Sequence, residues 1–282
     1  MLFSSVNIRP RLAQLWFLVL SVFFILFTSS LLSAPENKGM TLVLRVDGTI
    51  NPAVSDYLRK GLQRAADQND PLIIIRMNTP GGLDASMRDI IQAILSSPIP
   101  VVTYVSPDGA RAASAGTYIL YASHVAAMAP ATNLGAATPI QIGGLGGAKD
   151  EDKPDEEDAK DSRSALERKI INDASAYIKA LADKHNRNGE WAVQAVQEAV
   201  SLTAREALEL NVINIVANDL DDLLDQLDGY QLAVDGEPVS LITSELGVEH
   251  LEQSWRYKLL GVISDPTIAY LLLLLGFYGL IY

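Results

Sequence analysis

The sequence predicts an α/β fold in which a mostly parallel β-sheet is flanked by helices. The chain has 282 residues, of which 49% are hydrophobic, enough for one sizeable domain or two small ones. Apolar runs of strand length alternate along the chain with amphipathic segments of helical period. The strand-like runs are apolar on both faces, as expected for a parallel sheet that helices cover.

The first half of the chain shows this alternation most clearly. In the first predicted helix, Val54, Leu58 and Leu62 recur at helical spacing, and Asn51 or Pro52 opens the segment. The predicted strands are 41–46, 72–77, 101–105 and 125–128, and the helices between them are 52–66, 84–95 and a segment that begins at about 114.

The second half is predicted to be mainly helical. Thr203 and Glu206 have the spacing of a capping box, and Asp219 is placed to cap a helix that ends at Leu227. The predicted elements are helices at 163–184, 191–200 and 203–210, a strand at 212–216, a helix after 219, and a strand-rich piece at 230–243.

Composition excludes several classes of function. The net charge of −12 argues against a nucleic-acid partner. The sequence has no cysteine, so it has no disulfide, thiolate zinc site or cysteine nucleophile. The histidines, His124, His185 and His250, are too scattered to indicate a metal site. We therefore expect neither a metal nor another cofactor.

Both ends of the chain carry membrane signals. Arg9 and Arg11 precede an apolar run at 15–27 and small residues up to Ala34, so 1–34 is predicted to be a signal peptide or an uncleaved signal anchor. Residues 266–282 carry no charge and predict the start of a transmembrane helix in a truncated chain. The alternative is an apolar helix that docks on the domain. The main domain is expected outside the cytoplasm.

The expected domain organisation follows from these signals. The main domain is assigned to 38–230 and a small strand-rich connector to 231–262. Within the main domain, a glycine-rich and then acidic stretch at about 143–162 has little to bury and much like charge, which predicts a mobile surface loop. A cation site in that stretch is the functional alternative.

One hydroxyl stands out among small residues. Ser114 lies in the run Ala112-Ala113-Ser114-Ala115-Gly116, where the pattern changes from strand to helix. A serine at the first turn of a helix can be approached closely by another backbone, and its oxygen lies near the positive end of the helix dipole. Ser114 is therefore a candidate nucleophile, although serine is also an ordinary N-cap residue.

A second stretch supplies candidate main-chain donors. The strand at 72–77 leads into Asn78-Thr79-Pro80-Gly81-Gly82, and two glycines let the backbone turn its N–H groups toward a ligand. One strand end with free amides and another with a serine are the parts of an oxyanion site for acyl transfer.

These stretches together resemble a known family. Asn78-Thr79-Pro80-Gly81-Gly82, Ala112 to Tyr118, Met128-Ala129-Pro130 with Gly135-Ala136, and Leu202 to Leu208 occur in the order found in the NfeD long-form membrane serine proteases, partner proteins of the stomatin operon. The resemblance covers about 38–282 and implies a ClpP/crotonase-like fold. The family usually has an acidic residue where this sequence has Asn78.

The resemblance implies a Ser-Lys dyad. Ser114 matches the family nucleophile, and Lys169 matches the general-base lysine that opens a helix of the form Lys-Ile-x-Asn. The amides of Gly82 and Ala115 match the oxyanion hole. A lysine acts as a base only when it is neutral, which requires burial. We expect a helix edge with Ala176 and Ala180 to supply that burial.

A Ser-His-Asp triad is the competing mechanism. His124 follows Ser114 by ten residues at the far end of the same predicted helix. That position favours a capping or packing histidine over a catalytic one.

Three functions follow as hypotheses. The first is a membrane-anchored serine endopeptidase, with its domain on the extracytoplasmic, periplasmic side, that cleaves hydrophobic segments of membrane proteins. The resemblance implies a stomatin-like protein as substrate or partner, and a homo-oligomer of two or more copies. The second is a catalytically silent scaffold that organises a stomatin-like protein at the membrane. The third is a crotonase-like acyl-CoA enzyme, against which the export signal argues.

Overall fold

The computed structural model describes residues 39–140, 156–253, 255–263 and 266–281. The predicted signal at 1–34 and the first part of the acidic stretch lie outside these residues. The described residues fall in one compact unit that begins at Gly39.

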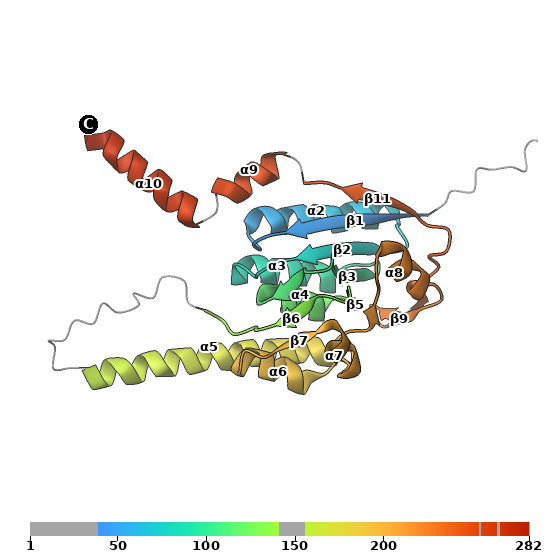
Figure 1. The fold of residues 1–282 in the computed structure, drawn as a ribbon, viewed down its shortest axis with the longest axis horizontal. Helices are drawn as coiled ribbons and strands as arrows, with labels where there is room; N and C mark the ends of the chain where they lie inside the picture. The colour runs from blue at the N-terminus through green and yellow to red at the C-terminus, as the bar shows by residue number, and fades with distance from the viewer. Residues whose placement is uncertain (1–38, 141–155, 254, 264–265, 282) are drawn as a thin grey trace, which may run out of the picture. The chain divides into compact units, whose positions relative to one another are not determined.

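A six-stranded sheet forms the centre of this unit, and all its neighbouring strands pair in parallel (Figure 1). The order of the strands is β11-β1-β2-β3-β5-β8. The predicted mostly parallel α/β fold is thereby confirmed. The strands are β1 (Met40–Asp47), β2 (Ile73–Asn78), β3 (Val101–Val105), β5 (Val125–Met128), β8 (Ile215–Val216) and β11 (Gly247–Leu251).

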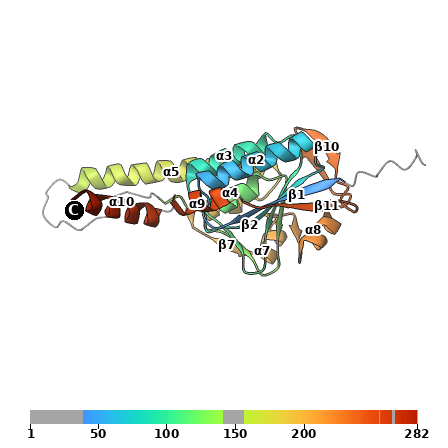
Figure 2. The ribbon, with the colours of Figure 1, turned by 90° about the horizontal axis from the view of Figure 1, so that it is seen from above.

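Helices cover both faces of this sheet. One face packs against α2 (Pro52–Gln68), α3 (Asp84–Leu95) and α4 (Ala115–Ala122), and the other packs against α8 (Leu220–Leu227) and the hairpin of β9 (Gln231–Val234) and β10 (Glu237–Ser240). Figure 2 shows α2 and α3 on one side of the strands and α8 on the other. The two hydrophobic clusters on either side explain why the central strands carry apolar residues on both of their faces.

Three further helices lie between residues 156 and 209. The helix predicted to begin at Arg163 begins earlier, as α5 (Glu156–Lys184), so the last part of the predicted acidic loop is helical. It is followed by α6 (Gly189–Gln197) and by α7 (Ala204–Glu209), which has the predicted capping box between Thr203 and Glu206.

The strand predicted at 212–216 is shorter than expected, because only Ile215 and Val216 form β8. The N–H groups of Val212 and Ile213 both donate to the carbonyl of Ala207, at 2.8 and 3.2 Å, and are therefore used to close the turn after α7.

A small second sheet was not predicted. It consists of β4 (Arg111–Ala113), β6 (Asn133–Gly135) and β7 (Ser201–Thr203), in the order β4-β6-β7. Each of these strands has three residues, too few for an alternation to appear in sequence. This sheet leads directly into Ser114.

The C-terminal segments continue the main sheet and then leave it. β11 pairs in parallel with β1, so the segment expected to be a connector contributes a strand to the main sheet. It is followed by α9 (Trp255–Ile263) and α10 (Pro266–Ile281). Among the described residues, no helix has the length and apolarity needed to cross a membrane. The start of a transmembrane helix at 266–282 stays a prediction.

Candidate active site

Ser114 has a backbone conformation that side-chain-bearing residues rarely adopt. It is the N-cap residue of α4, with φ 53° and ψ −116°. Its N–H lies 3.3 Å from the carbonyl oxygen of Gly135 and 3.2 Å from that of Ala136, so the second sheet holds it in place. The side chain does not cap the helix. The ordinary reason for a serine at this position is therefore missing.

The turn after β2 lies directly against this serine. The hydroxyl of Thr79 organises the turn, since the N–H of Gly81 donates to it at 3.0 Å. The main chain of Thr79 also pairs with β4 in a parallel bridge to Ala112, two residues before Ser114. Gly81 has φ +114°, which favours glycine. A Cβ built on Gly81 would collide with the side chain of Ser114, so the glycine turn and the serine are in direct contact.

The two predicted oxyanion donors both line the pocket at Ser114. Gly82 is held by main-chain bonds on either side of it, from Ile50 N–H to the carbonyl of Gly81 at 2.8 Å and from Leu83 N–H to the carbonyl of Ile50 at 2.9 Å. Within the described part of the chain, the N–H groups of Gly82 and Ala115 have no acceptor. Unpaired donors beside a hydroxyl are the requirement for stabilising an oxyanion.

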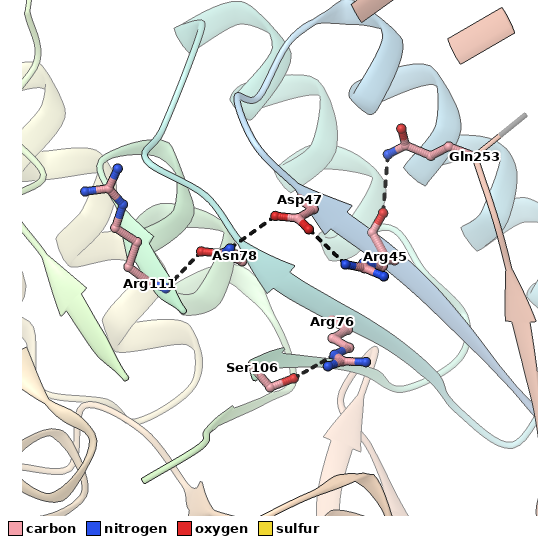
Figure 3. Close-up of polar contacts among 7 residues, drawn as sticks. All are labelled: Arg45, Asp47, Arg76, Asn78, Ser106, Arg111 and Gln253. Carbon is pink, nitrogen blue, oxygen red and sulfur yellow. Dashed lines mark hydrogen bonds and ion pairs between the residues drawn. The ribbon is translucent and has the colours of Figure 1, made fainter. Parts of the chain in front are cut away.

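The side chain of Asn78 bonds the end of β2 to two neighbouring strands. Its amide nitrogen donates to Asp47 at 3.1 Å and its amide oxygen accepts the N–H of Arg111 at 3.2 Å, as Figure 3 shows. The amide thus links β1 to β4, the strand that leads to Ser114. A carboxylate at position 78 would face Asp47 with like charge, so the neutral amide of Asn78 fits its surroundings.

The pocket itself is mostly apolar. It has a volume of about 240 Å³. Burial raises the pKa of Tyr118, whose hydroxyl donates to the carbonyl of Ala137 at 3.2 Å, so this side chain stays neutral. The residues that line this pocket at Ser114 are Gly82, Leu83, Asp84, Met87, Arg88, Ser114, Ala115, Tyr118, Ala137, Pro139, Ile140 and Ala174. A separate and larger groove of about 670 Å³, between α2 and α3, does not include Ser114.

Lys169 is exposed on α5 and does not line this pocket. The expected burial by Ala176 and Ala180 was wrong, because both of these side chains are exposed too. The face of α5 that packs inward carries Ala174, Ile178 and further residues at helical spacing. Among the described residues, no amine or imidazole hydrogen-bonds to the Ser114 hydroxyl.

His124 has a packing role, as predicted. Its Nδ1 accepts the N–H of Val101 at 3.1 Å, and its ring makes an edge contact with His185 at 5.6 Å between centroids. The eight residues of α4 separate it from Ser114, a rise of about 12 Å. Burial lowers the pKa of His124 to about 4. The triad alternative has no support in this geometry.

Sequence reasoning missed Arg88, which lines the pocket from α3. Its guanidinium bonds to Asp84 and to Asp173 of α5, each at 2.9 Å. The spacing of Asp84 and Arg88 was a visible signal, since residues four apart on a helix face each other. The partner on α5 had no such signal. No group of three or more metal-ligating side chains occurs within the described residues.

The fold and the site define a parallel α/β protein in which a serine hydroxyl that does not cap its helix lies beside unpaired main-chain amides. The sequence model of the NfeD1b N-terminal domain matches residues 40–235, so the chain belongs to the NfeD1b family. The chain is 38% identical over 266 residues to the membrane-bound protease PH1510 of Pyrococcus horikoshii, covering 94% of this chain and 56% of that protein. It is 29% identical over 263 residues to the membrane protein NfeD1b of Bacillus subtilis, covering 93% and 55%. The chain thus spans little more than half the length of these curated relatives.

Solved structures agree with this assignment. The 1510-N membrane-bound stomatin-specific protease, as a lysine-to-alanine variant in complex with a substrate peptide, matches with a TM-score of 0.69 and 36% identity, covering 81% of this chain and 99% of that one. A serine-to-alanine variant of the same protease matches with a TM-score of 0.67 and 36% identity, covering 77% and 99%.

Proposed function

We propose that this chain is the catalytic part of a membrane-anchored serine endopeptidase that cleaves hydrophobic segments of a stomatin-like protein. The proposal rests mainly on the Ser114 hydroxyl, which does not cap α4 and lies beside the free amides of Gly82 and Ala115. The names of the relatives support it, because PH1510 is called a membrane-bound protease and 1510-N a stomatin-specific one. The apolar pocket lining suits an apolar substrate segment.

In the proposed mechanism, Ser114 Oγ attacks the scissile carbonyl carbon while its proton passes to a neutral Lys169 amine. The carbonyl oxygen becomes an oxyanion that accepts hydrogen bonds from the N–H groups of Gly82 and Ala115. The tetrahedral intermediate collapses to an acyl-enzyme, and the protonated amine gives its proton to the leaving amine. Water then hydrolyses the ester in a second cycle of the same groups.

The role of Lys169 requires a change from the exposed position described above. An apolar substrate segment that covers the pocket would exclude water and lower the pKa of an amine brought beside Ser114. Active-site hydrogen bonds that are absent without substrate often form only in the complex. The lysine-to-alanine and serine-to-alanine variants of the 1510-N protease support a lysine and a serine as the residues to test.

The location and assembly are part of the same proposal. The predicted export signal at 1–34 and the uncharged helix α10 favour a domain anchored at the membrane on its extracytoplasmic side. A homo-oligomer, of two copies or more, follows from the resemblance.

The test is the cleavage of an internally quenched peptide that copies an apolar segment of a stomatin-like protein. Ser114→Ala and Lys169→Ala are expected to abolish cleavage with an unchanged circular dichroism spectrum. Ser240→Ala on β10 and Lys179→Ala on α5, both at exposed positions, are matched controls that should keep full activity. Full activity of Ser114→Ala would overturn the proposal.

A second candidate is the catalytically silent scaffold. It is favoured by one observation, the absence of a hydrogen-bonded base at Ser114 among the described residues. An active-serine probe such as a fluorophosphonate separates the two functions. Covalent labelling of the native chain and none of Ser114→Ala supports the protease, whereas no labelling of either supports the scaffold.

A further inference from the structure

Arg88 joins three helices at the wall of the pocket. Its Nε bonds to Asp84 on α3 and its terminal nitrogen to Asp173 on α5, each at 2.9 Å. The guanidinium carbon also lies 4.5 Å from the ring centroid of Tyr177 on α5. That ring stacks at 6.1 Å on Tyr118 of α4, which lines the pocket. Arg88 thus holds one particular turn of α5 against the pocket.

That turn is adjacent to Lys169. Asp173 follows Lys169 by four residues, a spacing at which side chains of a helix lie on the same line and can pair. Glu167 and Arg168 are two residues and one residue away and do not face Lys169 in this way. On α5, Asp173 is therefore the anion best placed to pair with the lysine, and Arg88 engages it instead.

The neighbouring helices add few other charges. On α3, Asp84 and Arg88 neutralise each other in part, and on α4 Tyr118 stays neutral, because burial raises its pKa. On α6, which packs along α5, the charged side chains are Glu190 and the C-cap residue Glu198, and both are exposed. Tyr177 on α5 is likewise held neutral, because burial raises its pKa. The charge that Lys169 experiences would accordingly depend on whether Asp173 is bonded to Arg88.

We propose that Arg88 is a positioning residue that keeps Asp173 away from Lys169, so that the amine can lose its proton and act as the base. This inference rests on the proposed Ser-Lys mechanism. A carboxylate paired with an amine favours the charged form of the amine. If Arg88 released Asp173, the lysine would stay protonated at neutral pH and would be unable to accept the proton of Ser114.

The test is the pH profile of peptide cleavage by Arg88→Met, Asp173→Asn and the double variant. For Arg88→Met we expect kcat at pH 7 to fall about tenfold, since the rising limb of the profile should move up by about one pH unit. KM should change less than threefold, and activity should return at high pH. In Asp173→Asn and in the double variant, the rising limb should lie at the pH where it lies in the native chain, because no carboxylate is left to pair with Lys169.

Two controls keep the outcome interpretable. Arg64→Met removes an arginine of similar exposure, which forms the 2.6 Å ion pair between α2 and Glu249 of β11, and should leave the profile unchanged. Arg88→Lys, which keeps a cation for Asp173, should restore most of the activity.

Two results would overturn the inference. One is an Arg88→Met variant that folds, as shown by its melting temperature, and has an unchanged profile. The other is a double variant as inactive as Arg88→Met, which would make Arg88 only a structural support. Full activity of Lys169→Ala would instead reject the dyad itself.

Discussion

A Cβ added to Gly81 would lie 2.6 Å from the Cβ of Ser114 and 3.1 Å from its Oγ. The turn after β2 and the proposed nucleophile are therefore in direct contact, with no room for a side chain between them. This closeness brings the next amide, that of Gly82, to the same pocket as the hydroxyl.

The first prediction is that Gly81→Ala removes activity. The methyl group would displace Ser114 or the turn, so we expect at least a hundredfold loss of peptide cleavage. Because a φ of +114° is strained for alanine, the free energy of unfolding should also fall by about 1–3 kcal/mol. Gly48→Ala is the control, because Gly48 has a φ of +110° with no atom within 4 Å of the added Cβ. Equal activity of the two variants would contradict the prediction.

The second prediction concerns the pocket. Ala174 is 7% exposed and lines the pocket from α5. Ala174→Phe would fill much of this space, and we expect kcat/KM to fall at least tenfold. Ala176→Phe, on the exposed side of the same helix, should have little effect. Comparable activity of both variants in the peptide assay would show that the substrate does not enter this pocket.

The third prediction concerns the far end of α4. Arg187 is buried and donates to the carbonyls of Tyr121 and Ser123, each at 2.9 Å, and to the amide oxygen of Asn214 at 2.8 Å. Arg187→Met would remove a donor from both carbonyls, whereas the amide oxygen of Asn214 would keep the N–H of Ala126, so we expect a loss of about 3–5 kcal/mol in the free energy of unfolding in urea. Arg205→Met, at an exposed site on α7, should lose less than about 0.5 kcal/mol.

The fourth prediction is that the free energy of unfolding falls in mild acid, at pH values above those at which carboxylates titrate. Burial lowers the pKa of His124 to about 4 and that of His185 to about 3. In the unfolded chain, both would titrate near about 6.5. Between these values the unfolded state binds more protons, so stability falls as the pH is lowered from about 6.5.

With both histidines contributing, the free energy of unfolding should decrease by up to about 2.7 kcal/mol per pH unit between pH 6 and 5. Urea unfolding at several pH values measures this slope. The variant His124→Asn/His185→Asn should have a flatter dependence in the same window. An equally steep dependence of the variant would assign the effect to other groups.

Four strands of the main sheet, β1, β2, β3 and β5, could be predicted because each contains an apolar run that is buried on both faces. The caps at Thr203 and Asp219 could be predicted too, since the N-cap side chain and the amides that it caps are neighbours in sequence. The pairing of β11 with β1 had no such signal, because it joins residues about 200 apart and the alternation of β11 is weak.

Some features of the candidate site could also be predicted from sequence, and others could not. Ser114 and Gly82 could be found because each follows a recognisable strand and is marked by small residues. Whether a side chain of α5 is buried depends on the rotation of that helix against the pocket, which a motif match does not determine. Lys169 was accordingly expected to be buried and is exposed, and the bond from Arg88 to Asp173 was not anticipated.

The pairing of β11 with β1 has a consequence for how this protein is shortened. The family match ends at 235, before β11, whereas β1 bonds to β11 from Met40 to Leu44. A fragment cut at 235 would leave β1 as a bare edge strand, with unsatisfied main-chain groups next to an apolar face. Such a fragment is expected to aggregate when it is expressed, and one that extends past Leu251 is expected to stay in solution better.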